Sequence, residues 1–371
     1  MKLKNEKLAI VLAGLAIGVI AALLVLFGNP TNMGFCIACF LRDTAGGLKL
    51  QAAVQYVRPE IIGLVLGSFI MASLKKEWAP KGGSAPLTRF ILGFFVMVGC
   101  LAFLGCPFRM ILRLAGGDLN AVFGLIGFAG GILAGVFFLN KGYSLKRTYK
   151  QPKLEGAAFP IIQVVVLVIL VGFSSLLAFS EKGPGSLHAP IIISLAAGLI
   201  VGALAQRTRL CMVGGIRDVV LFKETKLIFG FIAIFLAALV GNLVLNGVVA
   251  DKTFFKLGFE SQAVSHSAQL WNVLGMALVG FACTLLGGCP LRQLILAGEG
   301  NTDSAITVLG LIVGAAFCHN FGLAGSPDTV NDAGEYIVGG PGTNGKIAVI
   351  VGLVVVTIIA CVNTFSKKKE Q

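Results

Sequence analysis

The sequence predicts an all-α polytopic membrane protein with about ten transmembrane segments and several re-entrant or half helices. Of its 371 residues, 56% are hydrophobic and only 13% are charged, and the mean hydropathy is +0.91. These values exclude an ordinary water-soluble domain. Apolar runs near the roughly 20 residues needed to cross a bilayer recur along the chain, and shorter glycine-interrupted apolar stretches lie between them.

The expected spans are apolar runs separated by polar or glycine-rich turns. They cover residues 8–27, 60–74, 89–105, 120–139, 159–180, 190–206, 226–249, 271–288, 304–322 and 346–365. The expected half helices cover residues 34–50, 106–116, 209–222 and 289–298. Irregular backbone at membrane depth is tolerated only where protein or water covers it, so we expect the half helices to line a cavity. Many glycines lie four residues apart within the spans, which predicts close helix packing.

The net charge of +13 comes from Lys and Arg in short loops between apolar spans, a pattern of membrane orientation rather than of nucleic-acid binding. The basic residues that we expect on the cytoplasmic side are Lys2, Lys4, Lys7, Lys75, Lys76, Lys81, Lys141, Lys146, Arg147, Lys150, Lys153, Arg207, Arg209, Lys223, Lys226, Lys367, Lys368 and Lys369. The acidic loop with Asp328, Asp332 and Glu335 falls outside, as does the loop 251–260. Both termini are therefore expected in the cytoplasm.

Two motifs occur twice. The segment 100–109, CLAFLGCPFR, matches the segment 283–292, CTLLGGCPLR, so that the two Cys-Pro-x-Arg steps align. The segment 36–43, CIACFLRD, matches the segment 211–218, CMVGGIRD, with Cys, Arg and Asp in the same register. The chain thus looks like two copies of one unit.

We expect a single transmembrane domain over 1–371, with a first repeat at 1–182 and a second at 183–371. Five spans in each repeat would insert the second copy upside down. Inverted repeats of this kind are common in transporters, which bind their substrate at the interface between the repeats.

The repeated Cys-Pro step predicts a helix start inside the membrane, because proline suits the first helical position. If the halves meet about an axis in the membrane plane, Cys106 and Cys289 approach from opposite sides and Cys36 and Cys211 flank the path. Protonated thiols are weak donors and soft acceptors, which suits a sulfur or selenium atom, and helix N-termini with nearby arginines attract an anion. The candidate substrate path comprises Cys36, Cys106, Cys211, Cys289, Arg109 and Arg292, with Cys39, Cys100 and Cys283 beside it.

These motifs resemble the YeeE/YedE family of bacterial inner-membrane sulfur-compound transporters, and the paired Cys-Pro-x-Arg steps resemble its selenium-transporter (YedE) branch. The resemblance implies uptake of a thiosulfate-like or selenium-containing anion, held by S–H to sulfur hydrogen bonds from Cys36, Cys106 and Cys289, with Cys211 as the symmetric fourth. It also implies a bacterial inner-membrane location and a cytosolic sulfurtransferase-like partner. Pro107 and Pro290, with the arginines after them, depart from thiosulfate-transporting members and leave room for a selenium species.

Other interpretations remain open. The arginines could be interfacial anchors or pair with Asp43, Asp118, Asp218 and Glu299, and Cys318 and Cys361 look like ordinary core thiols. The sequence is also compatible with a membrane thiol-disulfide oxidoreductase that uses Cys36/Cys39 and Cys100/Cys106. A third interpretation is a regulatory membrane protein that does not transport. The spans hold almost no Asp or Glu, so a carboxylate relay is not expected. We expect a transporter and not an enzyme, with no cofactor and no metal site. The expected partners are the small anion, membrane lipid and the cytosolic protein named above, and not nucleic acid.

Overall fold

The computed structural model describes residues 2–250 and 252–365, with side chains from residue 6 onward. The regular secondary structure of the described part is almost entirely helical, which confirms the predicted all-α class. Its helices are α1 (Lys2–Leu26), α2 (Ile37–Gly47), α3 (Pro59–Leu74), α4 (Pro86–Phe103), α5 (Pro107–Ala115), α6 (Asn120–Asn140), α7 (Lys153–Gly172), α8 (Ile191–Thr208), α9 (Met212–Phe222), α10 (Lys226–Val248), α11 (Gln269–Leu286), α12 (Pro290–Gly298), α13 (Thr302–Asn320) and α14 (Thr343–Phe365). The two-residue strands are β1 (Lys81–Gly82), β2 (Tyr149–Lys150), β3 (Gly325–Ser326), β4 (Thr329–Val330), β5 (Tyr336–Ile337) and β6 (Gly340–Pro341).

In the described residues, nine helical stretches are long and apolar enough to cross a membrane. The remaining expected span, 60–74, is α3, which is apolar but has only 16 residues. The four expected half helices are α2, α5, α9 and α12. Both boundaries of one span were wrong: the span expected at 159–180 is α7, which begins at Lys153 and ends at Gly172. After α7 the chain makes a short 3₁₀ turn.

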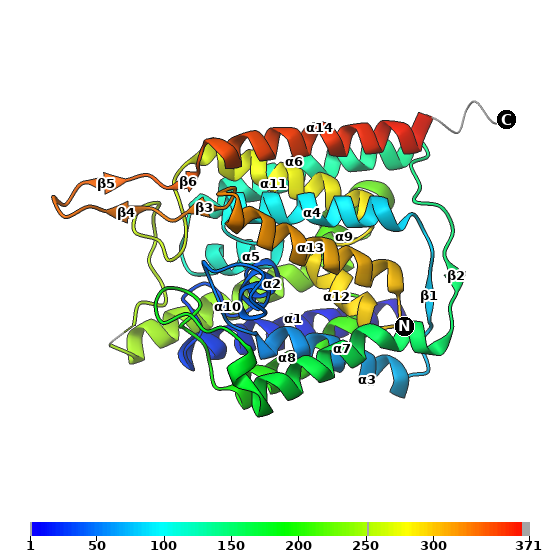
Figure 1. Ribbon diagram of the computed structural model, residues 1–371, viewed down its shortest axis with the longest axis horizontal. Coiled ribbons are helices and arrows are strands. Elements are labelled where there is room, and N and C mark those ends of the chain that lie inside the picture. Colours follow the sequence, from blue (N-terminus) through cyan, green and yellow to red (C-terminus); the bar gives the residue numbers. More distant parts are fainter. Residues whose placement is uncertain (1, 251, 366–371) are drawn as a thin grey trace.

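The long helices form two layers, and the half helices lie between them (Figure 1). One layer contains α4, α6, α11, α13 and α14, and the other contains α1, α3, α7, α8 and α10. The half helices contact both layers: α5, for example, packs on α6 and α10, and α12 packs on α13 and α3. The breaks in the helices are therefore covered by protein on both sides, as membrane depth requires.

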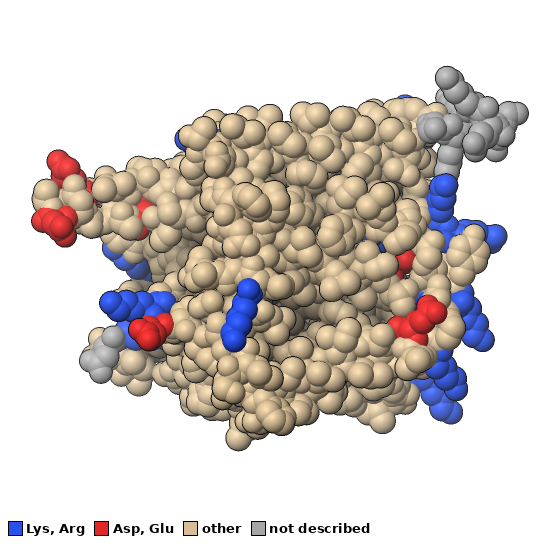
Figure 2. Space-filling model, viewed as in Figure 1, with Lys and Arg blue, Asp and Glu red and all other residues tan. Residues whose placement is uncertain are grey.

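The outer surface is apolar between two charged ends (Figure 2). Side chains such as Leu133, Ile161, Val165 and Ile350 are about half exposed, which suits contact with lipid rather than water. The strands β1 and β2 lie at one end and β3 to β6 at the other, and α14 ends on the side where α1 begins (Figure 1). Lys367, Lys368 and Lys369, Asp251 and the side chains of Lys2 and Lys4, which entered the topology prediction, lie outside the described part.

Glycines let the long helices approach backbone to backbone, and the contacts recur in both halves. A Cβ atom at Gly131 of α6 would meet the carbonyl oxygen of Ala277 in α11. When the repeated Cys-Pro steps are aligned, Gly314 of α13 is the counterpart of Gly131, and Phe94 of α4 is the counterpart of Ala277. A Cβ atom at Gly314 would indeed meet the carbonyl oxygen of Phe94. The close approach in one half is thus matched by one in the other.

The helix pairs of the second layer also pack through glycine. In the pair α1 and α10, a Cβ atom at Gly14 would meet the carbonyl oxygen of Gly230. In the pair α8 and α3, a Cβ atom at Gly198 would meet that of Glu60. Each layer is therefore built on helix pairs whose backbones touch.

This packing predicts that Gly131→Ala destabilises the protein while Gly130→Ala, on the same helix, does not. The added methyl at residue 131 would meet the α11 backbone, whereas nothing lies within 4 Å of the Cβ position at residue 130. We expect Gly131→Ala to cost about 1–3 kcal/mol, as overpacking does, and Gly130→Ala to be neutral or slightly stabilising. Thermal unfolding of the two detergent-solubilised variants would check this, and equal melting temperatures would contradict it.

Candidate functional site

Each half helix begins immediately after a cysteine. Cys36, Cys106, Cys211 and Cys289 are the N-cap residues of α2, α5, α9 and α12, and all four have extended backbone. Pro107 and Pro290 take the first helical positions of α5 and α12, which confirms the helix starts predicted from the Cys-Pro steps. Four helix N-termini, with their outward-pointing N–H groups, therefore lie beside thiols in the protein interior.

The thiols of Cys36 and Cys211 cap their own helices. The Sγ atom of Cys36 accepts a hydrogen bond from the Cys39 backbone N–H at 3.3 Å, and that of Cys211 accepts one from Gly214 at 3.4 Å. A cysteine here replaces the serine or aspartate that usually satisfies the first N–H groups of a helix. Because sulfur is a weak acceptor, these N–H groups stay available to a better one.

The cysteines meet in pairs within each half. The Sγ atoms of Cys36 and Cys106 lie 4.0 Å apart, and the rings of Phe35 and Phe108 pack edge to face beside them. In the other half, the Met212 backbone N–H donates to the Sγ atom of Cys289 at 3.4 Å, which places Cys289 against the start of α9. The first pair joins α2 to α5 and the second joins α9 to α12, whereas no hydrogen bond in the described residues joins Cys106 to Cys289.

The second-tier cysteines lie next to the helix breaks. Cys39 is on the first turn of α2, and Cys100 and Cys283 are near the ends of α4 and α11; all three are fully buried. The carbonyl groups of Cys100 and Cys283 accept the N–H groups of Gly105 and Gly288, at 2.7 and 3.0 Å, and so close the ends of the two helices. All the cysteines of the candidate path belong to one hydrophobic core, which also contains Cys318.

Three of the four motif arginines pair with acidic residues. Arg42 bonds Asp43 at 2.6 Å, and Arg217 bonds Asp218 at 2.8 Å. Arg292 bonds Glu299 at 3.1 Å. The structure therefore shows the ion pairs with neighbouring aspartates that the sequence suggested for Arg42 and Arg217.

Arg109 differs from the other three. Asp118, its expected partner, pairs instead with Arg113 at 2.6 Å. Arg109 is fully buried and donates to the backbone carbonyls of Asn32 at 3.3 Å and Ala263 at 3.1 Å, and also to Leu104. Among the described residues it has no acidic partner, so its positive charge is not neutralised locally. This fixed charge lies near the start of α5, between two loops of the β3–β6 end.

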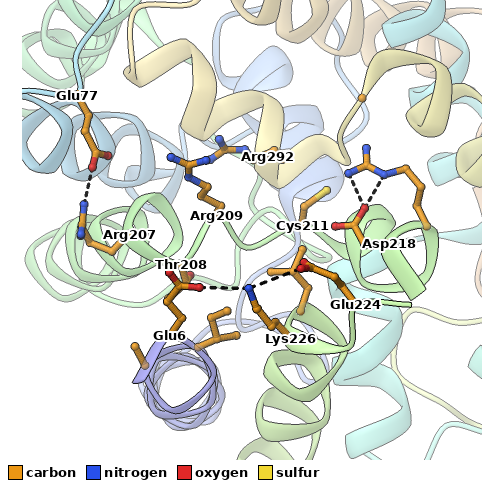
Figure 3. Close-up of a pocket in the computed structure, with 15 residues that line it drawn as sticks. Glu6, Glu77, Arg207, Thr208, Arg209, Cys211, Asp218, Glu224, Lys226 and Arg292 are labelled. Atoms are coloured by element: carbon orange, nitrogen blue, oxygen red, sulfur yellow. Dashed lines mark hydrogen bonds and ion pairs between the residues drawn. The ribbon is translucent and has the colours of Figure 1, made fainter. Parts of the chain in front are cut away.

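A cavity of about 890 Å³ reaches Cys211, one member of the second cysteine pair, from the opposite end of the molecule. Figure 3 shows Cys211 at this cavity together with charged side chains from the ends of α3, α8 and α9. Its lining consists of Glu6, Ala9, Ile10, Glu77, Arg207, Thr208, Arg209, Cys211, Arg217, Asp218, Glu224, Lys226, Leu227, Gly287 and Arg292. Cys36 and Cys106 do not line it. In the described structure, Cys211 thus borders a polar cavity, whereas Cys289, Cys36 and Cys106 lie inside the core.

The model of the family described as Sulphur transport matches residues 207–371. The matched residues contain Cys211, Cys283 and Cys289 with α9, α11 and α12. The match supports the resemblance to the YeeE/YedE family of sulfur transporters that the motifs indicated. The chain is also 31% identical over 126 residues to the thiosulfate transporter TsuA of Escherichia coli (strain K12). That match covers 34% of this chain and spans about a third of the relative, 33% of its length.

Besides Arg113, the sequence analysis missed two further charged residues, Glu60 and Arg209. Glu60, in the first turn of α3, is fully buried and accepts from Asn29 at 2.9 Å and Ser194 at 3.0 Å, so one span does carry an intramembrane carboxylate. The position of Glu60 at the start of the apolar run 60–74 could have indicated a carboxylate at the edge of this span. Arg209 was counted only as a loop charge, yet it lines the cavity two residues before Cys211.

The cavity predicts unequal thiol reactivity. A small, water-soluble methanethiosulfonate reagent should modify Cys211 faster than Cys36 in the folded protein, because only Cys211 borders the polar cavity. Peptide mass spectrometry after timed exposure would measure both modification rates. In the control variant Cys211→Ser, the modified peptide assigned to Cys211 should be absent. Faster modification of Cys36 would contradict this structure of the site.

Proposed function

We propose that the protein carries a small sulfur-containing anion across the bacterial inner membrane, along a path between two inverted repeats that is lined by Cys36, Cys106, Cys211 and Cys289. The observation that carries the proposal is that these four cysteines occupy the N-cap positions of the four half helices inside the membrane domain. The sulphur-transport match of residues 207–371 and the similarity to a thiosulfate transporter support the sulfur chemistry.

The inverted repeat is supported by the packing. When the two repeats are aligned so that Cys106 matches Cys289, α6 corresponds to α13 and α11 corresponds to α4. The glycine contact between α6 and α11 then corresponds to the glycine contact between α13 and α4. The helices α2 and α5 lie toward the β3–β6 end in Figure 1, and α9 and α12 toward the opposite end. The final helices break the symmetry, since α7 packs on α3 and α12 whereas α14 packs on α4 and α11. An axis in the membrane plane would place one cysteine pair on each side of the path.

The chemistry of the pairs favours a soft anion. A helix N-terminus favours negative charge, and a protonated thiol offers a weak donor to a polarizable atom. Sulfur or selenium at one end of an oxyanion satisfies both preferences, whereas chloride satisfies only the first. Selenium as the natural cargo, and a sulfurtransferase-like partner in the cytosol, stay predictions of the motif resemblance.

The orientation follows from the loop charges. The loops at the cavity end contain Lys75, Lys76, Lys146, Arg147 and Lys223, so this end faces the cytoplasm by the positive-inside rule. The cavity is then an inner vestibule, and the pair Cys36 and Cys106 lies on the outer side of the path. The state described here is open toward the cytoplasm and closed toward the outside.

Uptake into proteoliposomes tests the proposal. Cys106→Ala and Cys289→Ala should each lower the uptake of radiolabelled thiosulfate by about tenfold or more, since the anion loses a partner in a water-poor path. Cys361→Ala is the matched control, because that thiol lies half-buried on α14 outside the core that holds the others. We expect the control to transport at the parental rate.

The outcomes separate the rival functions. Parental uptake by both path variants would contradict the cysteine path. A thiol oxidoreductase would instead lose disulfide exchange in Cys39→Ser alone, and a regulatory protein would accumulate no sulfur or selenium compound. Competition of labelled uptake by thiosulfate, sulfite, selenite and sulfide would rank the substrates.

A further inference from the structure

The cavity beside Cys211 is charged, and its charges are unevenly matched. Five basic residues line it: Arg207, Arg209, Arg217, Arg292 and Lys226. Arg207 bonds Glu77 at 2.9 Å, and Lys226 bonds Glu6 at 3.2 Å, while Arg217 and Arg292 have the acidic partners described above. In the part of the chain that the structure describes, Arg209 is the lining cation with no acidic partner.

The backbone directs Arg209 toward this cavity. Arg209 ends α8 in the left-handed conformation, with φ of 53°, and its N–H group donates to the carbonyl of Gln206 at 3.3 Å. A non-glycine residue rarely adopts this conformation. Here it ends α8, and α9 starts shortly afterwards, at Met212. Arg209 and Cys211 both lie in this break between the helices and line the same cavity.

Arg292 comes from the other side of the cavity, on the first turn of α12. Only its Nη1 atom has a partner in the described residues, Glu299, so most of its five N–H donors remain free. Figure 3 shows the side chains of Arg209 and Arg292 pointing toward one another. Two guanidinium groups facing each other repel unless an anion lies between them.

We propose that Arg209, Arg292 and Cys211 form an inner binding site for a small divalent oxyanion with a sulfur terminus, of the thiosulfate type. The two guanidinium groups bind the sulfonate oxygens, since planar forks of N–H donors suit oxyanions. The thiol contacts the terminal sulfur. This inference rests on the proposed function and adds the residues that hold the anion where it leaves the path.

The neighbouring Arg207 offers a matched control. It lies two residues before Arg209 and lines the same cavity, but Glu77 neutralises it. Hydrogen bonds from Gln206 and Arg207 hold the pKa of Glu77 below its usual range, so the pair stays ionised at neutral pH. Arg207→Gln and Arg209→Gln remove the same charge from the same turn and differ only in the partner lost.

Calorimetric titration of the purified full-length protein with thiosulfate, and separately with sulfate, tests the site. We expect Arg209→Gln and Arg292→Gln to weaken the binding of both anions about tenfold, as the loss of a charge-assisted hydrogen bond does. Arg207→Gln should bind as the parent does. Cys211→Ala should weaken thiosulfate but leave sulfate unchanged, because sulfate has no sulfur terminus.

Equal affinities of Arg209→Gln and the parent, an equal loss in Arg207→Gln, or no binding of either anion by the parent would each overturn the inference. Uptake by the same variants keeps the two proposals apart. Binding that follows the expected pattern without any uptake would refute the transport function and leave the site standing. Parental uptake and parental binding by Arg209→Gln would refute the site and leave transport standing.

Discussion

A helix that breaks at membrane depth leaves backbone N–H and C=O groups that hydrocarbon cannot satisfy, and the rest of this structure answers that constraint. Four half helices start inside the domain, each with a cysteine at its N-cap position, and two layers of long helices cover them. Glycine contacts bring the backbones of neighbouring long helices together. This close packing of the long helices leaves space for the half helices between the layers. Sulfur caps are weak acceptors, so the helix starts remain able to attract an anion.

The two ends of the molecule present different electrostatics to that inner layer. At the β3–β6 end, Arg109 is buried with carbonyl partners only, and the cysteine pair beside it is enclosed. At the other end, a polar cavity with paired and unpaired charges reaches Cys211. An anion that crosses would leave a region of fixed positive charge, pass thiols, and arrive at arginines again. On the proposed path, soft contacts in the middle and charged contacts at the ends would bind an anion without trapping it.

The helices were predictable because their signals are local. Apolar runs located the spans to within a few residues, except for α7, and the Cys-Pro steps located the starts of α5 and α12. The pairing of Cys36 with Cys106 was not predictable, since it depends on how the folded chain brings together the starts of α2 and α5, which are far apart in the sequence. The pairing of Asp118 with Arg113 rather than with Arg109 was not predictable for the same reason. Both arginines are close enough to Asp118 in the sequence to contact it, and only the packing of the turn decides which of them does. Arg209 looked like an ordinary loop charge until the left-handed turn put it beside Cys211.

The central claim is that thiols at the helix breaks meet the passing anion. Selenosulfate, in which selenium replaces the terminal sulfur of thiosulfate, would reveal the contact directly through anomalous scattering in crystals of the protein. We predict selenium peaks within contact distance of the Sγ atoms of Cys211 and Cys289, or of Cys36 and Cys106. Peaks confined to the charged surfaces, with none beside any of these four cysteines, would contradict the claim.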